Sequence, residues 1–291
     1  MAGTDLLRIY HDEPQRMPID LYEWLHPGYL IGGKYPYVAP IAHGRIGLIL
    51  KIRDDEAGEF ALKTVRPKTR RLSSPGELEL LEESLAMEFR LMSRFHHENI
   101  IAAHEILQDP KLGACIVMEY APGGDLRQRI EDRVMTHEES LFVFERLVDV
   151  LCVLHRPGAD GACGIVHLDL ESKNVVFDRS GIPKLCDFHY AREIRREESV
   201  RDLPPEPAAE IDVRTDLYQL GRLLYEMLSY GSPDPERLGM IPDRMRPLVA
   251  RLLVRDSACQ YADIQQVRLA YRALDAEQWA AQWGPPPEPH R

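Results

Sequence analysis

The stretch from Gly164 to Tyr190, GIVHLDLESKNVVFDRSGIPKLCDFHY, restricts the possible fold more than any other part of the sequence. It contains two β-type runs, residues 175–177 and 184–186, separated by a Ser-Gly turn signal. A hairpin built from these runs places Asn174, just before the first, beside Asp187, just after the second. Asp169 lies five residues before Asn174. The stretch therefore predicts two carboxylates and a carboxamide held close together.

These side chains suit the handling of a metal–nucleotide complex. Oxygen ligands such as those of Asn174 and Asp187 collect Mg²⁺ together with nucleotide phosphates. The remaining carboxylate, Asp169, can then accept a proton from an attacking hydroxyl or orient it. The alternative is a polar loop between strands whose carboxylates face water, but the order, spacing and strand context all favour the functional interpretation.

The pattern resembles the catalytic loop and the metal-binding turn of the protein kinase superfamily, H-R-D-L-x-x-x-N and D-F-G. This chain reads H-L-D-L-x-x-x-N and D-F-H, so it departs from the family at Leu168 and His189. The resemblance implies that Asp169 acts on the hydroxyl of the acceptor. It also implies that Asn174 and Asp187 hold the metal, and that His189 restricts the turn after Asp187.

A second resemblance lies in residues 37–52, two β-rich runs around a turn that contains Gly44 and Gly47. Kinases carry G-x-G-x-x-G-x-V here, and their backbone N–H groups approach the phosphates. This chain has Ala42 in place of the first glycine and Ile49 in place of the valine. Alone, the motif is also compatible with a plain hairpin turn.

Residues 59–63, EFALK, resemble the V-A-I-K strand of kinases. Ala61 and Lys63 lie on the same face of a strand. The resemblance implies that Ala61 packs on adenine and that Lys63 holds the α- and β-phosphates. The helical pattern over 75–95 places Glu88 on an apolar side, where the family pairs a glutamate with this lysine.

The run ACIVMEYAPGGDL at 114–126 predicts a strand ending at Glu119, followed by a flexible joint. It resembles the hinge between kinase lobes, which implies backbone hydrogen bonds from Glu119 and Ala121 to adenine and a ribose contact for Asp125. The full set of implied nucleotide contacts is Ala42, Gly44, Gly47, Ile49, Ala61, Lys63, Met118, Glu119, Ala121, Asp125, Val176 and Cys186.

Three later features extend the resemblance to the end of the second lobe. The helix opening at Thr215-Asp216 resembles S-D-x-W-x-L-G, whose aspartate anchors the backbone of the catalytic loop. Residues 203–206, LPPE, resemble the A-P-E motif that closes the activation segment. Gln260 stands where the family usually has an arginine that pairs with the glutamate of that motif.

The fold class predicted from these elements is α+β, a two-lobed protein-kinase-like fold. The small lobe has an antiparallel sheet and one helix, and the large lobe is mainly helical. The expected domains are an N-terminal arm at 1–35, a kinase-like domain at 36–275, divided near residue 120, and a proline-rich tail at 276–291.

Charge and composition exclude some classes of partner. With 47 acidic and 36 basic residues, the net charge of -11 argues against a general nucleic-acid binder and against anionic membranes. No apolar run has membrane-spanning length, and the N-terminus lacks a signal-peptide core. The five cysteines are widely spaced. They favour a reducing cytoplasm.

Two features admit a different interpretation. His96, His97 and His104 offer a metal site of poor spacing, although the first two lie in a stretch that resembles the usual helix exit H-P-N-I-V. The end of the chain, WGPPPEPHR from Trp283, is compatible with a polyproline ligand or with a loose terminus.

The predicted function is that of an ATP- and Mg²⁺-dependent protein kinase acting on protein hydroxyls. One alternative is a pseudokinase scaffold, motivated by Ala42, Leu168, His189 and Gln260; another is a small-molecule kinase of the aminoglycoside or choline type. Serine and threonine are favoured as the residues that are phosphorylated, but tyrosine stays open. Ser/Thr kinases usually carry lysine where this chain has Glu171, whereas Lys173 is closer to the tyrosine-kinase arrangement.

Overall fold

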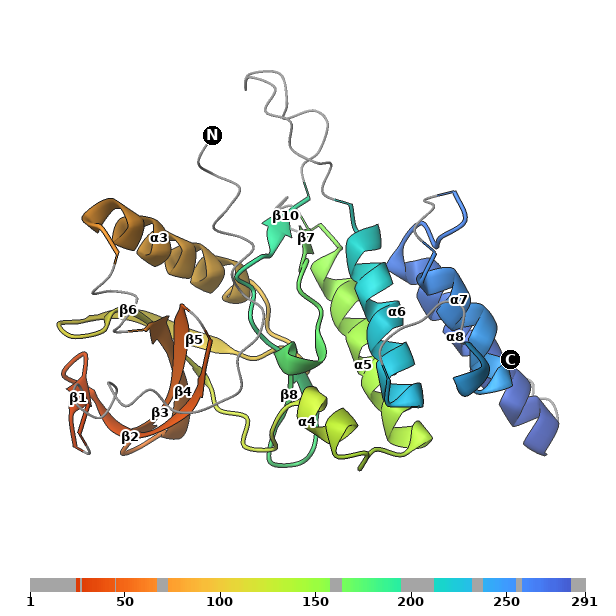
Figure 1. The fold of residues 1–291 in the computed structure, drawn as a ribbon, viewed down its shortest axis with the longest axis horizontal. Coiled ribbons are helices and arrows are strands. Elements are labelled where there is room, and N and C mark those ends of the chain that lie inside the picture. The colour runs from red at the N-terminus through yellow and green to blue at the C-terminus, as the bar shows by residue number, and fades with distance from the viewer. Residues whose placement is uncertain are drawn as a thin grey trace, which may run out of the picture. The chain divides into compact units, whose positions relative to one another are not determined.

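The computed structural model describes residues 25–26, 28–44, 46–66, 73–157, 164–194, 212–231, 238–254 and 258–283, with the backbone alone from 275 onward. The chain divides into two compact units (Figure 1). The first unit runs to Pro122 and the second unit begins at Gly123.

The first unit is built on an antiparallel sheet with the strand order β1-β2-β3-β4-β6-β5. Its turns are short, so most strands pair with their neighbours in sequence. The strands are β1 (Leu30–Ile31), β2 (Tyr35–His43), β3 (Gly47–Asp54), β4 (Gly58–Val65), β5 (Ala103–Asp109) and β6 (Gly113–Glu119).

The central strands carry the core of this unit. Leu48, Leu50 and Ile52 alternate along β3 and are fully buried, as period-two patterning requires. Strand β6 is buried on both faces: Cys115 and Val117 join the cluster around β3, whereas Ala114 and Ile116 pack in the cluster that includes Leu85. A strand that is covered on both faces has a continuous run of apolar residues in the sequence.

Helix α3 (Pro75–Met92) covers the second face of this sheet (Figure 1). It begins with a capping box, in which Ser74 accepts from the N–H of Glu77 and Glu77 accepts from the N–H of Ser74. The buried side of the helix carries Leu85, Glu88 and Met92. A buried glutamate on this side requires a cation, which the sheet supplies.

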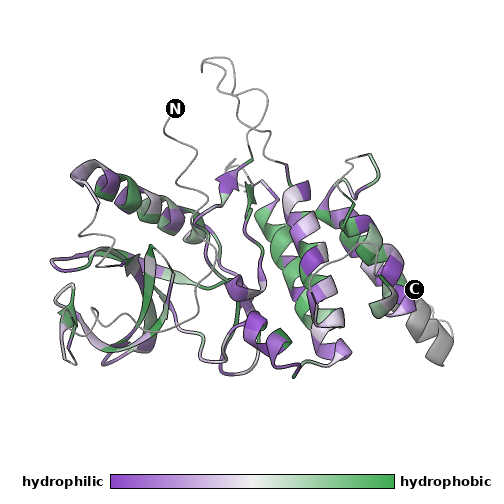
Figure 2. Ribbon diagram, in the orientation of Figure 1, coloured by the Kyte–Doolittle hydropathy of each residue, from purple (hydrophilic) through white to green (hydrophobic). Residues whose placement is uncertain are grey.

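The second unit is mainly helical, and hydrophobic residues run along α5 (Figure 2). In the described part of the chain, no helix is long and apolar enough to cross a membrane. The helices of the second unit are α4 (Leu126–Glu131), α5 (His137–Leu154), α6 (Arg214–Ser229), α7 (Arg246–Leu252) and α8 (Ile264–Trp283), with single 3₁₀ turns at Ser172–Asn174, Leu238–Met240 and Asp243–Met245.

Helices α6 and α7 approach each other closely at Gly221. A Cβ atom added at Gly221 would lie 2.5 Å from the Cβ atom of Leu252, so only glycine permits this packing. The glycine belongs to the stretch that resembles S-D-x-W-x-L-G. Its role in this protein is therefore to let α7 pack against the helix that carries Asp216.

Four short strands connect the helices and carry the predicted site. The hairpin β8 (Val175–Phe177) and β9 (Pro183–Leu185) is antiparallel, as predicted. Strand β7 (Ile165–Val166) pairs with β10 (Arg192–Glu193), and the N–H of Ile194 donates to the carbonyl of Gly164 at 2.7 Å. The residues on both sides of the hairpin are thus tied to each other.

The expected limits of the N-terminal arm and the C-terminal tail require correction. Leu30 and Ile31 form β1, because Asp109 accepts hydrogen bonds from the Tyr29 hydroxyl and from the N–H of Gly32. A two-residue strand leaves no alternating pattern, so the sequence did not reveal it. Helix α8 extends to Trp283, past the expected limit at residue 275. The possible short helix at 21–24 and residues 284–291 lie outside the described residues.

Candidate active site

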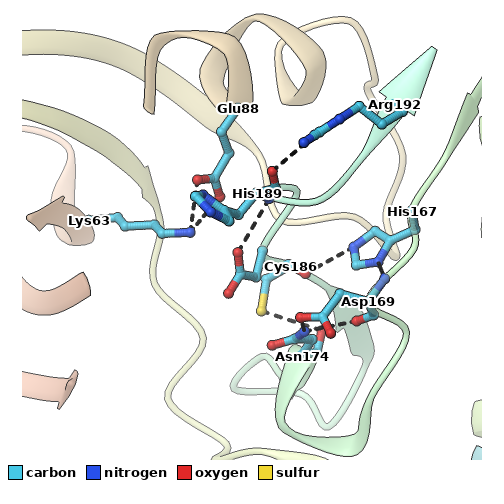
Figure 3. Close-up of polar contacts among 9 residues, drawn as sticks. Lys63, Glu88, His167, Asp169, Asn174, Cys186, His189 and Arg192 are labelled. Carbon is cyan, nitrogen blue, oxygen red and sulfur yellow. Dashed lines mark hydrogen bonds and ion pairs between the residues drawn. The ribbon is translucent and has the colours of Figure 1, made fainter. Parts of the chain in front are cut away.

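The first unit holds Lys63 with a buried carboxylate. The Nζ atom of Lys63, on β4, lies 2.7 Å and 2.8 Å from the two carboxylate oxygens of Glu88 on α3 (Figure 3). The Glu88 side chain is only 1% exposed and that of Lys63 13%. Since a buried charge requires a partner, the pair fixes the ammonium group at one place on the sheet.

The predicted adenine contacts lie on the same face as this lysine. Ile49 on β3 is opposite Lys63, and Met118 on β6 is opposite Ala61. Directly opposed residues of an antiparallel pair share a face, as do residues two apart. The structure thus brings Ile49, Ala61, Lys63 and Met118 together on one surface of the sheet.

The end of β6 refines the predicted hinge contacts. The backbone N–H of Glu119 donates to the carbonyl of Ala102 at 2.9 Å. It is therefore engaged within the first unit. The backbone group of Glu119 left for the predicted contact with adenine is its carbonyl, which would accept a hydrogen bond from the base.

The turn between β2 and β3 is closed by its own backbone. The N–H of Gly44 donates to the carbonyl of Gly47 at 2.9 Å, and Arg66 donates to the carbonyl of Gly44 at 3.1 Å. A Cβ atom at Gly44 would meet nothing within 4 Å. Internal packing therefore does not require glycine there, and the space above the turn suits the close approach of a ligand. Ala42 pairs with Ile49 in the strand.

In the second unit, α6 holds the backbone of the predicted catalytic loop. The carboxylate of Asp216 accepts from the N–H groups of His167 and Leu168, each at 2.8 Å. The amide of Gln219 accepts from the N–H of Leu170 at 3.0 Å and donates to the carbonyl of Leu168 at 2.9 Å. The anchoring role expected of Asp216 is confirmed, and Gln219 shares it.

These hydrogen bonds explain an unusual backbone conformation. Leu168 has φ of 65°, in the left-handed region. For a branched residue this conformation costs energy and persists only where the surroundings impose it. Here both backbone polar groups of Leu168 are bound by α6, which imposes it.

His167 connects the loop to the end of the hairpin. Its Nδ1 atom accepts from the N–H of Asp169 at 3.3 Å, and its Nε2 atom lies 3.3 Å from the carbonyl oxygen of Cys186 (Figure 3). This pattern requires a proton on Nε2 and none on Nδ1. The ring also makes an edge contact with Phe188 at 4.9 Å. One buried imidazole thus orients Asp169 and the turn that begins at Asp187.

Asp169 and Asn174 contact each other directly. The Asn174 amide nitrogen donates to the carbonyl oxygen and to the carboxylate of Asp169, both at 2.8 Å (Figure 3). Burial is the main cause that raises the pKa of the Asp169 carboxyl. Charges on Glu171 and Asp187 add to that rise, and Lys173 opposes it. A carboxylate with increased proton affinity is suited to accept a proton.

The hairpin brings Asp187 next to Asn174, as the sequence predicted. The N–H of Cys186 donates to the carbonyl of Asn174 at 2.9 Å. Because the amide nitrogen of Asn174 is bound to Asp169, its oxygen is the atom that it can present to a cation. A carboxylate and an amide oxygen are ligands that fit Mg²⁺. These residues therefore fit the metal that the resemblance implies.

The backbone of the turn after Asp187 shows what replaces the usual glycine. The left-handed residue of this turn is Asp187, with φ of 63°, whereas His189 does not have positive φ. The N–H of His189 donates to the Asp187 carboxylate at 3.4 Å. Arg192 binds the carbonyls of His189, at 3.3 Å, and Ala191, at 2.8 Å (Figure 3). The turn therefore does not require glycine at position 189.

Comparison with known proteins decides the family. The model of the protein kinase domain matches residues 35–241. The chain belongs to the protein kinase family. This confirms the α+β, two-lobed kinase fold predicted from the sequence.

The chain is similar to kinases of distant organisms, and two of the following three are serine/threonine kinases by name. It is 31% identical to NUAK family SNF1-like kinase 2 of Rattus norvegicus, over 53% of this chain and 23% of that protein. It is 28% identical to the serine/threonine-protein kinase SRK2E of Arabidopsis thaliana, over 76% and 59%. A probable serine/threonine-protein kinase of Streptomyces coelicolor is 26% identical over 85% and 41%. The chain thus spans less than two thirds of the length of these relatives.

Gln260 has a different partner from the arginine that kinases usually have at this place. Its amide nitrogen donates to the carbonyl of Leu252 at 3.1 Å, at the end of α7, and lies 3.5 Å from that of Arg214. The amide satisfies carbonyl groups at helix ends, a role that needs no acidic partner. The expected A-P-E-like motif at 203–206 lies outside the described residues.

The second-unit nucleotide candidates lie around the start of α4. Asp125 caps this helix by accepting from the N–H of Gln128 at 2.8 Å, and it forms a β-bridge with Val176. Gly123 lies so close to the hairpin that an added Cβ would come within 2.8 Å of Phe177. Asp125, Val176 and the hairpin that ends at Cys186 therefore form one piece of structure. The ribose contact expected of Asp125 stays a prediction.

The alternative histidine metal site finds no support in the structure. Among the described residues, no group of three or more His, Cys, Asp or Glu side chains is placed to hold a metal ion. The Nδ1 atom of His97 accepts from the N–H of Asn99 at 3.1 Å, and His104 makes an edge contact with Phe60. Both rings have local structural roles.

Sequence reasoning missed two residues at the site, Gln219 and Arg127. Gln219 lies three residues after Asp216, on the same helix face, and that spacing could have identified it. Arg127 on α4 was missed because only the fold brings it to within 3.7 Å of Glu171, which also binds Lys173 at 3.1 Å. No local pattern in the sequence points to Arg127.

Proposed function

We propose that the chain is an ATP- and Mg²⁺-dependent kinase that phosphorylates hydroxyl groups of proteins. The observation that carries this proposal is the arrangement of Asp169, Asn174 and Asp187. The first two are joined by a side-chain hydrogen bond, and the hairpin ties the backbone of Asn174 to that of Cys186, next to Asp187. The Lys63–Glu88 pair supplies the cation that a nucleotide phosphate requires.

Each residue has a defined role in the proposal. Asn174 and Asp187 would hold Mg²⁺, which supplies positive charge to the phosphates when it is bound. Lys63 would bind the α- and β-phosphates, and Glu88 would keep it in place. Asp169 would orient the acceptor hydroxyl and take its proton, which suits its raised pKa.

The proposed transfer needs only ATP, the acceptor hydroxyl and Asp169 to account for every bond and proton. A bond forms between the acceptor oxygen and the γ-phosphorus. The bond from this phosphorus to the bridging oxygen breaks, and its electron pair leaves with ADP. The hydroxyl proton passes to Asp169, so that no oxidant or reductant is involved.

Serine and threonine are the proposed acceptors, because several of the relatives are serine/threonine kinases by name. Glu171 and Lys173 are the residues that leave tyrosine open as an alternative. The proposed partners are ATP and a protein substrate, and the proposed location is the cytoplasm. Phosphoamino-acid analysis of the labelled product distinguishes the acceptors, and cell fractionation tests the location.

The departures that motivate a pseudokinase scaffold have structural solutions in this chain. Leu168 is held through its backbone, the positive φ of the turn falls on Asp187 and not on His189, and the amide of Gln260 binds backbone carbonyls. None of them removes a group that the proposed reaction uses. An assay of phosphate transfer therefore decides between the active kinase and the pseudokinase scaffold.

Transfer of radiolabelled phosphate from ATP to general protein substrates tests the proposal. With Mg²⁺ present, Asp169→Asn should lower the rate about 1000-fold because the proton acceptor is lost. Asp243→Asn, which changes an exposed aspartate in the second unit, is the matched control and should keep the wild-type rate. Equal labelling by wild type and Asp169→Asn would show that the chain is not an enzyme of this kind.

Binding is measured separately by thermal denaturation. A ligand at 100 times its Kd stabilises the folded state by about 2.7 kcal/mol, so ATP with Mg²⁺ should raise the Tm. Asp187→Ala should remove the part of the shift that depends on Mg²⁺. A Tm that neither ATP nor ADP changes, with or without metal, would favour a scaffold that binds no nucleotide.

A further inference from the structure

Two arginines of the second unit, one on α4 and one on α6, form ion pairs beside the catalytic loop. Nη2 of Arg127 lies 3.7 Å from a carboxylate oxygen of Glu171, and Nη2 of Arg222 lies 3.7 Å from one of Glu226. Burial is the main cause that raises the pKa of the Glu226 carboxyl. The charge of Glu171 adds to this rise, whereas Arg222 and Arg127 oppose it. The four side chains therefore act on one another, and we call them the arginine–glutamate cluster.

The guanidinium groups of this cluster have donors that the described part of the chain does not use. A separation of 3.7 Å is close enough for an ion pair but exceeds the length of a hydrogen bond. The side chains of Arg127 and Arg222 are 47% and 48% exposed. A guanidinium group has five N–H donors in a planar fork that matches a carboxylate. Both arginines can therefore bind an anion that comes from outside the chain.

Stability does not explain why these arginines are present. Ion pairs made by a half-exposed arginine contribute little to folding. Glu171 also has a nearer cation, because Nζ of Lys173 lies 3.1 Å from the same carboxylate oxygen that Arg127 approaches. The raised pKa of Glu226 means that its carboxyl holds negative charge less firmly than an exposed glutamate does. Both arginines thus keep positive charge that their partners do not fully balance.

The cluster lies next to the place proposed for the acceptor hydroxyl. The N–H of Glu171 donates to the carbonyl of Asp169 at 3.0 Å, so Glu171 is adjacent to the residue that would orient this hydroxyl. An extended peptide advances by about 3.3 Å per residue. A substrate side chain two or three positions from the acceptor is therefore within reach of Arg127, which extends to Glu171.

We propose that Arg127 and Arg222 select substrates with an acidic residue a few positions from the acceptor, by binding its carboxylate. This rests on the proposed kinase function and names its substrate class. The bonds made and broken are those of the phosphate transfer, and neither arginine gains or loses a proton. Before the substrate binds, Glu171 and Glu226 keep the arginines in place through the two ion pairs. The substrate carboxylate then accepts charge-assisted hydrogen bonds from the unused N–H donors, which are stronger than the contacts at 3.7 Å.

Peptide substrates test the proposal in steady-state kinetics with the full chain, ATP and Mg²⁺. Each peptide has a single serine in a neutral sequence and a single glutamate, which is moved through roughly four positions on either side. Matched peptides carry glutamine or arginine in place of the glutamate. At the best position, the wild type should have a kcat/KM about 10-fold higher for the glutamate peptide than for its glutamine match. This preference should fall when NaCl is raised to about 0.5 M, because salt screens exposed charges.

Variants of the two arginines locate the preference. Arg127→Gln and Arg222→Gln should each lower the ratio of the two kcat/KM values about 3-fold, and together they should bring it to about 1. The double lysine variant keeps the charges and should retain part of the preference, whereas Arg127→Glu with Arg222→Glu should favour the arginine peptide. Arg244→Gln, which changes an exposed arginine in the 3₁₀ turn Asp243–Met245, is the matched control and should keep the wild-type ratio. Each ratio compares two peptides on the same protein, so a loss of folded protein does not alter it.

The outcomes separate this inference from the proposed function. If the wild type labels neither peptides nor general proteins more than Asp169→Asn does, the kinase function fails, and the inference fails with it. If the wild type is active but favours no glutamate peptide over its glutamine match, the inference alone is wrong. A preference for the arginine peptide would mean that Glu171 and Glu226 bind basic substrates instead, which also overturns it. So does a glutamate preference that persists in the double glutamine variant, because the acidic residue would then bind elsewhere.

Discussion

The two units hold their reactive groups by different means. In the first unit, a side chain holds a side chain: Glu88 binds the ammonium group of Lys63 with both oxygens. In the second unit, side chains hold the backbone: Asp216 and Gln219 bind N–H and carbonyl groups of residues 167–170. The first arrangement depends on the chemical identity of two residues. The second depends on the two residues of α6 and is less sensitive to the side chains of the loop.

This difference explains where the chain departs from other kinases. Lys63 and Glu88 both match the family, since replacing either would leave a buried charge without its partner. Leu168 departs from it at a position where the helix binds both the N–H and the carbonyl of the backbone. The departure at Leu168 thus occurs at a position that α6 holds through the backbone.

The largest effect is expected from breaking the ion pair of the first unit. Lys63→Met should lower phosphate transfer about 1000-fold, because the phosphate clamp is lost. It should also destabilise the fold by about 3 kcal/mol, because the Glu88 carboxylate stays buried. The double variant Lys63→Met with Glu88→Leu removes both charges and should return stability to near the wild-type value while activity stays lost.

Urea denaturation of the single and double variants, beside kinetic assays, measures both quantities. Lys51→Met, which breaks the more exposed pair with Glu59 in the same sheet, is the control and should have little effect on either. If the double variant is less stable than Lys63→Met, the ion pair contributes to folding in its own right, and the comparison between the units loses its basis.

A smaller loss of activity is expected from Asp216→Asn. The carboxylate accepts from two backbone N–H groups and from the His155 ring, at 2.9 Å, whereas asparagine has only one side-chain acceptor oxygen. The variant should lose about 3 kcal/mol of stability. It should also lose about 100-fold in kcat, since Leu168 and Asp169 are no longer held in position.

Chemical denaturation and kcat at a temperature where the variant is folded provide the measurements. Asp243→Asn, in which the side chain is 88% exposed, is the matched control. Wild-type kcat in folded Asp216→Asn would mean that the loop keeps its shape without α6, which contradicts the account given for Leu168.

The sequence predicted well those features that depend on residue order. The hairpin that joins Asn174 and Asp187 and the pairing of Lys63 with Glu88 were both predicted from spacing and family resemblance, and the structure shows both. It did not predict features that depend on distant partners. The left-handed conformation of Leu168 comes from contacts with α6, about 50 positions later in the chain. Strand β1 depends on Asp109 in the same way.

The smallest effect is expected from preventing phosphorylation of the activation segment. In many kinases, the arginine of H-R-D binds a phosphate on that segment, which orders it. Leu168 carries no charge and cannot make this contact. The start of the segment is instead tied to β7 through β10, and Arg192 binds the carbonyls of His189 and Ala191. The hydroxyl groups available for phosphorylation are those of Tyr190 and of Ser199, which lies outside the described residues.

We therefore expect phosphatase-treated wild type and the double variant Tyr190→Phe with Ser199→Ala to keep wild-type kcat on a model substrate. Leu168→Arg introduces the charge that many kinases have at this position. If this variant makes kcat depend on the phosphorylation state, the comparison is sharpened, because the same backbone would then carry a side chain that binds a phosphate. A large loss of kcat in both phosphate-free preparations, reversed when the treated wild type is phosphorylated again, would contradict this. It would mean that a cation at another position binds the phosphate, and that the backbone contacts alone do not order the segment.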